Sequence, residues 1–157
     1  MRPSRLIAVL SLSLAAAGCG WSPPGGSPTT SVACTKDDGP TADTVSAEIA
    51  KLPSAQWSEI VRGHTADCSL HWVVVTSGDA SDSPGQVLFF DRKTPIGTPT
   101  PDPRPYITIT AIGNNTASVQ YQWRQGQDPA CCPTGIAAVR FKLEDGKLKA
   151  LDPIPTA

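Results

Sequence analysis

Residues 69–76 read SLHWVVVT and form the most distinct strand signal in the sequence. It is rich in β-branched and aromatic side chains, which is typical of a β-strand, and Ser77 and Gly78 follow it as turn residues. The run is almost continuously apolar and does not alternate with polar residues. We therefore expect this strand to lie in the centre of a sheet.

Further strands are predicted downstream, in hairpin order. They are residues 86–90, 106–112, 116–124, 136–143 and 147–151. The segments YITITAI and TASVQYQWR alternate in polarity, which indicates strands with one buried face. Most connections are short, which favours antiparallel pairing. Residues 91–105 form a longer, proline-rich connection.

One helix is predicted ahead of these strands, over residues 42–51. Thr41 or Asp43 can cap its N-terminus, and Pro53 ends it. Apolar side chains recur on one face of this helix, at Val45, Ile49 and Leu52. The expected fold is α+β: one short N-terminal helix packed on a five- to six-stranded, mainly antiparallel sheet, stapled by disulfides.

The first residues have the form of a bacterial lipoprotein leader. Arg2 and Arg5 precede the uncharged apolar run 6–17, which is shorter than the roughly 20 residues that a membrane-spanning helix needs. Ala16-Ala17-Gly18-Cys19 then matches a lipobox, in which the cysteine receives the lipid. The alternative is an ordinary secretory signal with a cysteine near its end. We expect a signal peptide over 1–18, with Cys19 as the lipidated N-terminus.

Two parts are predicted after cleavage. Residues 19–33 are dominated by Gly, Pro, Ser and Thr and carry no charge, so they are predicted to form a flexible tether. Residues 34–157 suffice for one globular domain. The chain has 13 basic and 14 acidic residues with no basic patch, which argues against nucleic-acid binding. The expected location is the extracytoplasmic face of the cell membrane, and a monomer is expected.

Four cysteines remain once Cys19 is assigned to the lipid. Cys34, Cys68, Cys131 and Cys132 are an even number in an exported domain, which predicts two disulfides. A direct bond between adjacent cysteines closes a strained small ring and is rare. The two pairings in which Cys131 and Cys132 reach separate partners are therefore favoured, and the choice between them stays open. Neither zinc-ligand spacing nor a C-x-x-C motif is present in the sequence.

Candidates for chemistry are few. His71 lies within an apolar strand, where a satisfied histidine is the expected interpretation, and His64 lies in a loop without demonstrable partners. Asp79 and Asp82 share a glycine-flanked loop but lack the EF-hand pattern for calcium. The aromatic residues are expected in the core, although some could line a groove for an apolar or sugar ligand: Trp57, Trp72, Tyr106, Tyr121 and Trp123.

Several motifs resemble the LppP/LprE lipoprotein family of actinobacterial envelopes. They are DCSLHWVVV at 67–75, SPGQVLFF at 83–90, VQYQWRQG at 119–126, CCPTG at 131–135 and VRFKLEDGKL at 139–148. The similarity extends over about residues 34–153. It implies a lipobox leader and paired cysteines, and it adds no catalytic residue.

The sequence therefore predicts a non-catalytic envelope lipoprotein without metal or cofactor. It would be held to the membrane through lipid on Cys19, and its domain would bind an envelope protein, a lipid or a cell-wall component. A purely structural role is a variant of this hypothesis. The alternative is a secreted enzyme or thiol-redox protein that uses the Cys131/Cys132 pair.

Overall fold

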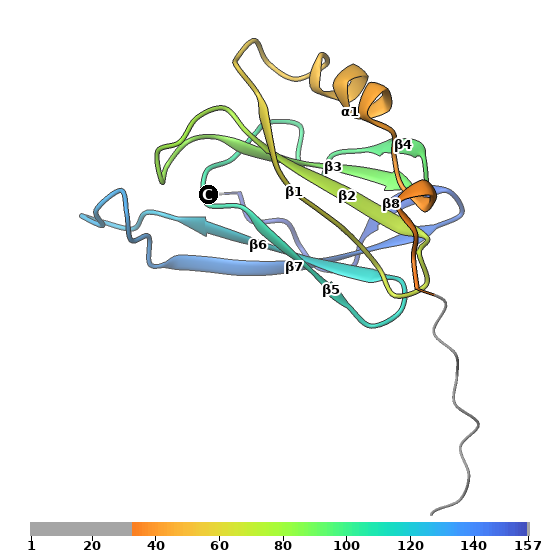
Figure 1. Ribbon diagram of the computed structural model, residues 1–157. Helices are drawn as coiled ribbons and strands as arrows, with labels where there is room; N and C mark the ends of the chain where they lie inside the picture. The colour runs from red at the N-terminus through yellow and green to blue at the C-terminus, as the bar shows by residue number, and fades with distance from the viewer. Residues whose placement is uncertain (1–32, 157) are drawn as a thin grey trace, which may run out of the picture. The chain divides into compact units, whose positions relative to one another are not determined.

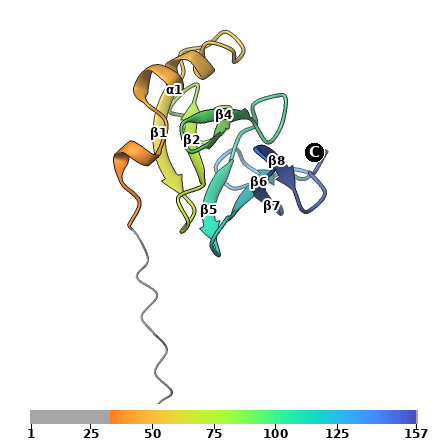
Figure 2. The same ribbon diagram turned by 90° about the vertical axis from the view of Figure 1, so that its right-hand side faces the viewer.

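A computed structural model describes residues 33–156. Their strands form two four-stranded antiparallel sheets, each in simple sequence order. The first sheet holds β1 (Ser58–His64), β2 (Leu70–Thr76), β3 (Gly85–Asp91) and β4 (Thr94–Gly97). The second sheet holds β5 (Thr108–Ile112), β6 (Thr116–Trp123), β7 (Gly135–Glu144) and β8 (Lys147–Ala150). Figures 1 and 2 show helix α1 (Ala42–Ile49) on one face of the first sheet and the second sheet on the other.

Strand β2 is central, as predicted, and is covered on both faces. It pairs with β1 on one side and with β3 on the other. Leu70, Trp72 and Val74 face the second sheet, whereas Val73 and Val75 pack with Val45 of α1. Because successive side chains of a strand point to opposite faces, a strand buried on both faces has no polar alternation. The double cover explains the continuous apolar run.

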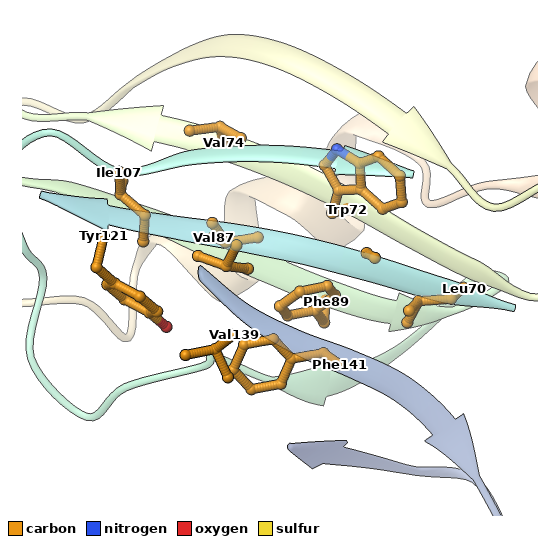
Figure 3. Packing of buried hydrophobic residues seen from close by; sticks show 11 residues of the cluster. Leu70, Trp72, Val74, Val87, Phe89, Ile107, Tyr121, Val139 and Phe141 are labelled. Atoms are coloured by element: carbon orange, nitrogen blue, oxygen red, sulfur yellow. The ribbon is translucent and has the colours of Figure 1, made fainter. Parts of the chain in front are cut away.

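The two sheets meet through a shared apolar core. Figure 3 shows side chains from both sheets in this cluster, and the rings of Phe89 and Phe141 lie 5.7 Å apart between their centroids. In β6 the buried residues alternate with half-buried ones, so one face of the second sheet turns to the core. The inner row of β6 begins with Ala117, Val119 and Tyr121, all buried. This alternation confirms the predicted half-buried strand.

Helix α1 forms where the sequence predicts it, ending two residues earlier. The Thr41 hydroxyl accepts a hydrogen bond from the Thr44 amide at 3.2 Å and so caps the first turn. Val45 is buried, and Ile49 and Leu52 pack against the same cluster. A short 3₁₀ helix, Lys36–Asp38, precedes α1.

The expectation of one sheet with five or six strands is wrong. Strand β1 escaped prediction because most of its residues are exposed and it carries Glu59, Arg62 and Gly63, which break any apolar pattern. Strand β4 has four residues inside the proline-rich connection. It lies at the edge of the first sheet, where Pro95 is tolerated because an edge strand leaves some amides unpaired.

The cysteines also pair differently from the expectation. Cys34 bonds to Cys68, with 5.5 Å between their Cα atoms, and Cys131 bonds to its neighbour Cys132. The two favoured pairings, in which Cys131 and Cys132 reach separate partners, are therefore wrong.

The reason is that the two pairs lie at opposite ends of strand β2. Cys68 stands just before β2, whereas Ser81, in the loop after β2, donates a hydrogen bond to the Ala130 carbonyl at 3.3 Å. A strand of that length spans about 20 Å at roughly 3.3 Å per residue. A disulfide needs Cα atoms within about 7 Å. Cys131 and Cys132 are therefore out of reach of Cys68.

The predicted signal peptide, Cys19 and nearly all of the predicted tether lie outside the described residues. Within residues 33–156 no helix combines the length and the apolar character that crossing a membrane requires.

Candidate binding site

The two histidines face each other across β1 and β2 but are held by backbone groups. His64 and His71 are direct partners in the strand register, with ring centroids 5.5 Å apart. His71 Nε2 contacts the Cys68 carbonyl at 3.1 Å, and His64 Nδ1 contacts the Thr65 carbonyl at 3.0 Å. Burial lowers the pKa of His71, which favours its neutral form. The prediction that His71 is a satisfied histidine is confirmed.

These histidines line a pocket of about 460 Å³ beside the Cys34–Cys68 disulfide. Gly39 closes tightly over His71, because a Cβ at that position would lie 2.8 Å from Nδ1. In residues 33–156 no group of three or more His, Cys, Asp or Glu side chains could hold a metal ion. The pocket therefore offers two imidazoles without a third metal ligand among the described residues.

A second pocket, of about 350 Å³, lies where the inner face of the second sheet continues past the core; we call it the Trp123 groove. Its lining residues are Asp82, Arg104, Pro105, Tyr106, Tyr121, Gln122, Trp123 and Arg124. Trp123 follows Tyr121 in the inner row of β6 but is only half-buried. Figure 1 shows the end of the β6–β7 hairpin projecting beside the loop that joins β2 to β3.

The Trp123 indole is seated on a glycine. Trp123 and Gly135 are direct partners across β6 and β7, and a Cβ at position 135 would lie 2.4 Å from the indole Nε1. Any other residue at 135 would therefore displace the ring. The absence of a side chain at Gly135 leaves room for the indole to lie against the sheet, and the indole lines the groove.

Arg104 and Tyr121 form the polar part of the groove wall. The Arg104 guanidinium carbon stands 5.5 Å from the centre of the Tyr121 ring, a cation–π contact, and its Nη1 donates to the Pro155 carbonyl at 2.7 Å. Burial raises the pKa of Tyr121 to about 12, so the phenol is neutral at physiological pH. The Tyr121 hydroxyl has no hydrogen-bond partner among the described residues.

Tyr106 is fixed by the loop that carries the adjacent cysteines. Its hydroxyl donates to the Ala130 carbonyl at 2.6 Å. Its backbone has φ of 55°, a left-handed conformation that a non-glycine residue seldom adopts without support. Arg104 anchors the preceding segment, because its amide and carbonyl exchange hydrogen bonds of 2.8 and 2.9 Å with Gly85. Hydrogen bonds therefore hold both the Tyr106 side chain and the backbone just before it in place.

The Asp128 carboxylate organises the same loop. It accepts hydrogen bonds from the amides of Gln125 and Thr134, each at 2.8 Å, and from the Thr134 hydroxyl at 2.7 Å. These bonds lower the pKa of Asp128. The Asp128 carboxylate thus joins the two ends of the β6–β7 loop, at Gln125 and at Thr134.

The structure sorts the aromatic candidates. Trp72 and Tyr121 are buried in the core, and Trp57 packs on the helix side of the first sheet. Tyr106 and Trp123 both line the groove, which is the exception that the sequence left open. Arg104 was missed, because nothing distinguishes it within the proline-rich connection. Asp82 lies at the groove without a calcium-type cluster in the described part of the chain.

Comparisons with known proteins assign the family. The family model for LppP/LprE lipoproteins matches residues 62–146. Curated proteins named as lipoprotein LppP, from Mycobacterium tuberculosis H37Rv and Mycobacterium bovis AF2122/97, are each 52% identical over 148 residues, covering 90% of this chain and 85% of the relative.

The chain belongs to the LppP/LprE lipoprotein family. The resemblance noted in the sequence is thereby confirmed. The residues that match the family run from within β1 to the turn before β8. They therefore include the whole Trp123 groove and both adjacent cysteines. No solved structure matches this family member.

Proposed function

We propose that this LppP/LprE family member is a membrane-anchored envelope lipoprotein, lipidated on Cys19, whose domain binds sugar rings of an envelope glycan in the Trp123 groove. In this proposal the domain is a non-catalytic binding module on the extracytoplasmic side. The observation that carries it is the half-buried indole of Trp123, fixed over Gly135 beside Tyr106 and Arg104.

Anchoring is supported by the leader and by the family. The lipobox ends at Cys19, and the relatives are named as lipoproteins. Two acyl chains on a cysteine hold a soluble domain at a bilayer, since each buried methylene contributes about 0.8 kcal/mol. The uncharged segment 19–33 would let the domain reach ligands away from the membrane surface.

The chemistry of the groove fits a sugar. A pyranose ring presents a flat C–H face that stacks on an aromatic ring, and Trp123 and Tyr106 supply such surfaces. Its edge carries hydroxyls, which the carboxylate of Asp82, the amide of Gln122 and the guanidinium of Arg104 are suited to bind. The volume of about 350 Å³ lies in the range of small-ligand pockets.

The groove has too few carboxyl groups for ordinary glycoside hydrolysis, which favours binding without cleavage. Glycoside hydrolysis ordinarily needs two carboxyl groups that flank the scissile bond. Asp82 is the sole carboxylate among the described residues that line the groove. Tyr121 is neutral and buried, which leaves it as a wall residue.

Co-sedimentation with insoluble envelope glycan tests this proposal. The mature chain is incubated with lipid-extracted cell walls and centrifuged, and the bound fraction is fitted for wild type, Trp123→Leu and Trp57→Leu. Trp57 is the matched control, because it is also a half-buried tryptophan but lies on the helix side. We expect at least about tenfold weaker binding for Trp123→Leu, as for loss of a stacked aromatic anchor, and unchanged binding for Trp57→Leu. Equal binding by all three proteins, or none by wild type, would refute the proposal.

A further inference from the structure

We propose that the Cys131–Cys132 disulfide is a redox-active site, which exchanges with a dithiol reductant and thereby loosens the Trp123 groove. The exchange itself needs no glycan. Its consequence, weaker sugar binding, rests on the proposed function.

Access favours exchange at this pair. Both cysteines are exposed in the loop between β6 and β7, whereas Cys34 and Cys68 are half-buried. Thiol–disulfide exchange requires a thiolate to reach one sulfur in line with the bond that breaks. A dithiol partner, either a small molecule or a protein, therefore meets Cys131–Cys132 first.

The exchange balances as a two-electron step. A thiolate of the reductant attacks one sulfur, the bond between the cysteine sulfurs breaks, and the other cysteine leaves as a thiolate that takes up a proton. The second thiol of the reductant then attacks the mixed disulfide and releases the first cysteine. Cys131 and Cys132 together gain two electrons and two protons, and the dithiol becomes a disulfide.

Opening the bond changes the freedom of a short turn. The closed ring contains both cysteine side chains and the peptide bond between them, so it restricts ψ of Cys131 and φ of Cys132. The Cys132 amide donates to the Pro129 carbonyl at 3.0 Å, which closes a turn over residues 129–132. Because Asp128 fixes both ends of the loop, the added freedom is confined to this turn.

The turn is directly coupled to the groove. Ala130, the residue before the ring, accepts hydrogen bonds at its carbonyl from Tyr106 at 2.6 Å and from Ser81 at 3.3 Å. Tyr106 lines the groove with Trp123. A turn that moves after reduction withdraws this carbonyl and releases the Tyr106 ring. Sugar binding would then have to order the Tyr106 ring again, and a cost equal to one net hydrogen bond corresponds to about fivefold weaker binding.

Graded reduction with two readouts tests the inference. The purified mature chain is equilibrated with increasing dithiothreitol, alkylated and mapped by mass spectrometry. In parallel, the indole N–H resonances of its tryptophans are recorded by NMR and assigned with Trp123→Phe. We expect Cys131 and Cys132 to be alkylated while Cys34–Cys68 is intact. Over the same range the Trp123 resonance shifts and that of Trp72 does not.

Two variants separate coupling from simple reducibility. The double variant Cys131→Ser/Cys132→Ser should show the shifted Trp123 resonance without reductant. Tyr106→Phe, which lacks the bond to Ala130, should release thiols normally but show little further shift. The inference is overturned if the pair opens only when the protein unfolds, or if the thiols appear without a change at Trp123. If oxidised wild type binds no glycan, the proposed function fails, and the alkylation and resonance readouts still decide the redox coupling.

Discussion

Trp123 and Gly135 are cross-strand partners in which the indole covers the glycine backbone so closely that no side chain fits between them. The same relation recurs in the first sheet, where a Cβ at Gly63 would lie 2.4 Å from the Trp72 ring. Trp72 is buried and lines the pocket beside His64 and His71, whereas Trp123 is half-buried and lines the Trp123 groove. In each sheet a tryptophan packed on a glycine therefore lies at a pocket, and Trp123 is the more exposed of the two.

Gly135→Ala is the first prediction. The added methyl group displaces the indole, so we expect a loss of about 1–3 kcal/mol in unfolding free energy, as for other overpacked sites, together with weaker glycan binding. Urea denaturation of the single variants and of Gly135→Ala/Trp123→Leu measures the coupling. In the Trp123→Leu background, Gly135→Ala should lower the unfolding free energy much less than it does in the wild type. Strictly additive effects would show that the ring is not in contact with residue 135.

A second prediction concerns the Tyr121 hydroxyl, which is buried without a partner in the described part of the chain. Removing an unpaired buried polar atom relieves its desolvation cost, so Tyr121→Phe should leave stability unchanged or raise it by up to about 1 kcal/mol. Tyr106→Phe is the contrasting variant, because it breaks the 2.6 Å bond to Ala130 and should lose about 1 kcal/mol. Thermal unfolding of both variants tests this pair. A clear loss in Tyr121→Phe would contradict the packing described.

Acid should destabilise the domain through His71. Burial lowers the pKa of His71 in the folded state. The unfolded chain therefore binds more protons at this residue, so stability is complete above the ordinary histidine pKa and falls as pH drops from there towards the folded value. The charges of His64 and Arg92 also lower the pKa of His71, whereas the charge of Asp38 raises it.

Urea midpoints at pH 7.5 and at pH 5 measure the effect, with His71→Asn as the variant and His64→Asn as the control. We expect the acid-induced loss to shrink in His71→Asn more than in His64→Asn. An NMR titration that places the pKa of His71 above its ordinary value would reverse the sign and refute the prediction.

Cys19 provides a prediction about location. Cys19→Ala removes the sulfur that would carry the lipid, so the protein should leave the membrane fraction and appear in the soluble extracytoplasmic fraction. Fractionation together with metabolic labelling by a clickable fatty acid checks both claims. The double variant Cys131→Ser/Cys132→Ser is the control and should stay labelled and membrane-bound. Membrane retention of unlabelled Cys19→Ala would contradict anchoring through this residue.

The sequence was informative where its signals are local. Thr41 and the apolar face of α1 predicted the helix, and the uninterrupted run ahead of Ser77 predicted the central strand. Strand β1 was missed because an exposed edge strand needs no apolar pattern, and its residues pair only through β2. The second sheet was missed because hairpin order alone does not say where one sheet ends and another begins.

The groove and the cysteine pairing depend on contacts distant in sequence. Trp123 is in the same alternating row as Tyr121, yet it is half-buried whereas Tyr121 belongs to the core. Arg104 approaches the Tyr121 ring from a proline-rich segment that has no periodicity. The separation of Cys68 from Cys131 follows from β2 lying between them. None of these relations can be predicted from the spacing of neighbouring residues in the sequence.

The most direct test of the central claim is an NMR titration of the mature chain with soluble fragments of envelope glycan. We predict saturable shifts of the Trp123 indole N–H and of the backbone amides of Tyr106 and Arg104, with the indole resonances of Trp57 and Trp72 unchanged. Shifts confined to the helix side, or to the pocket at His64 and His71, would contradict a binding site in the Trp123 groove.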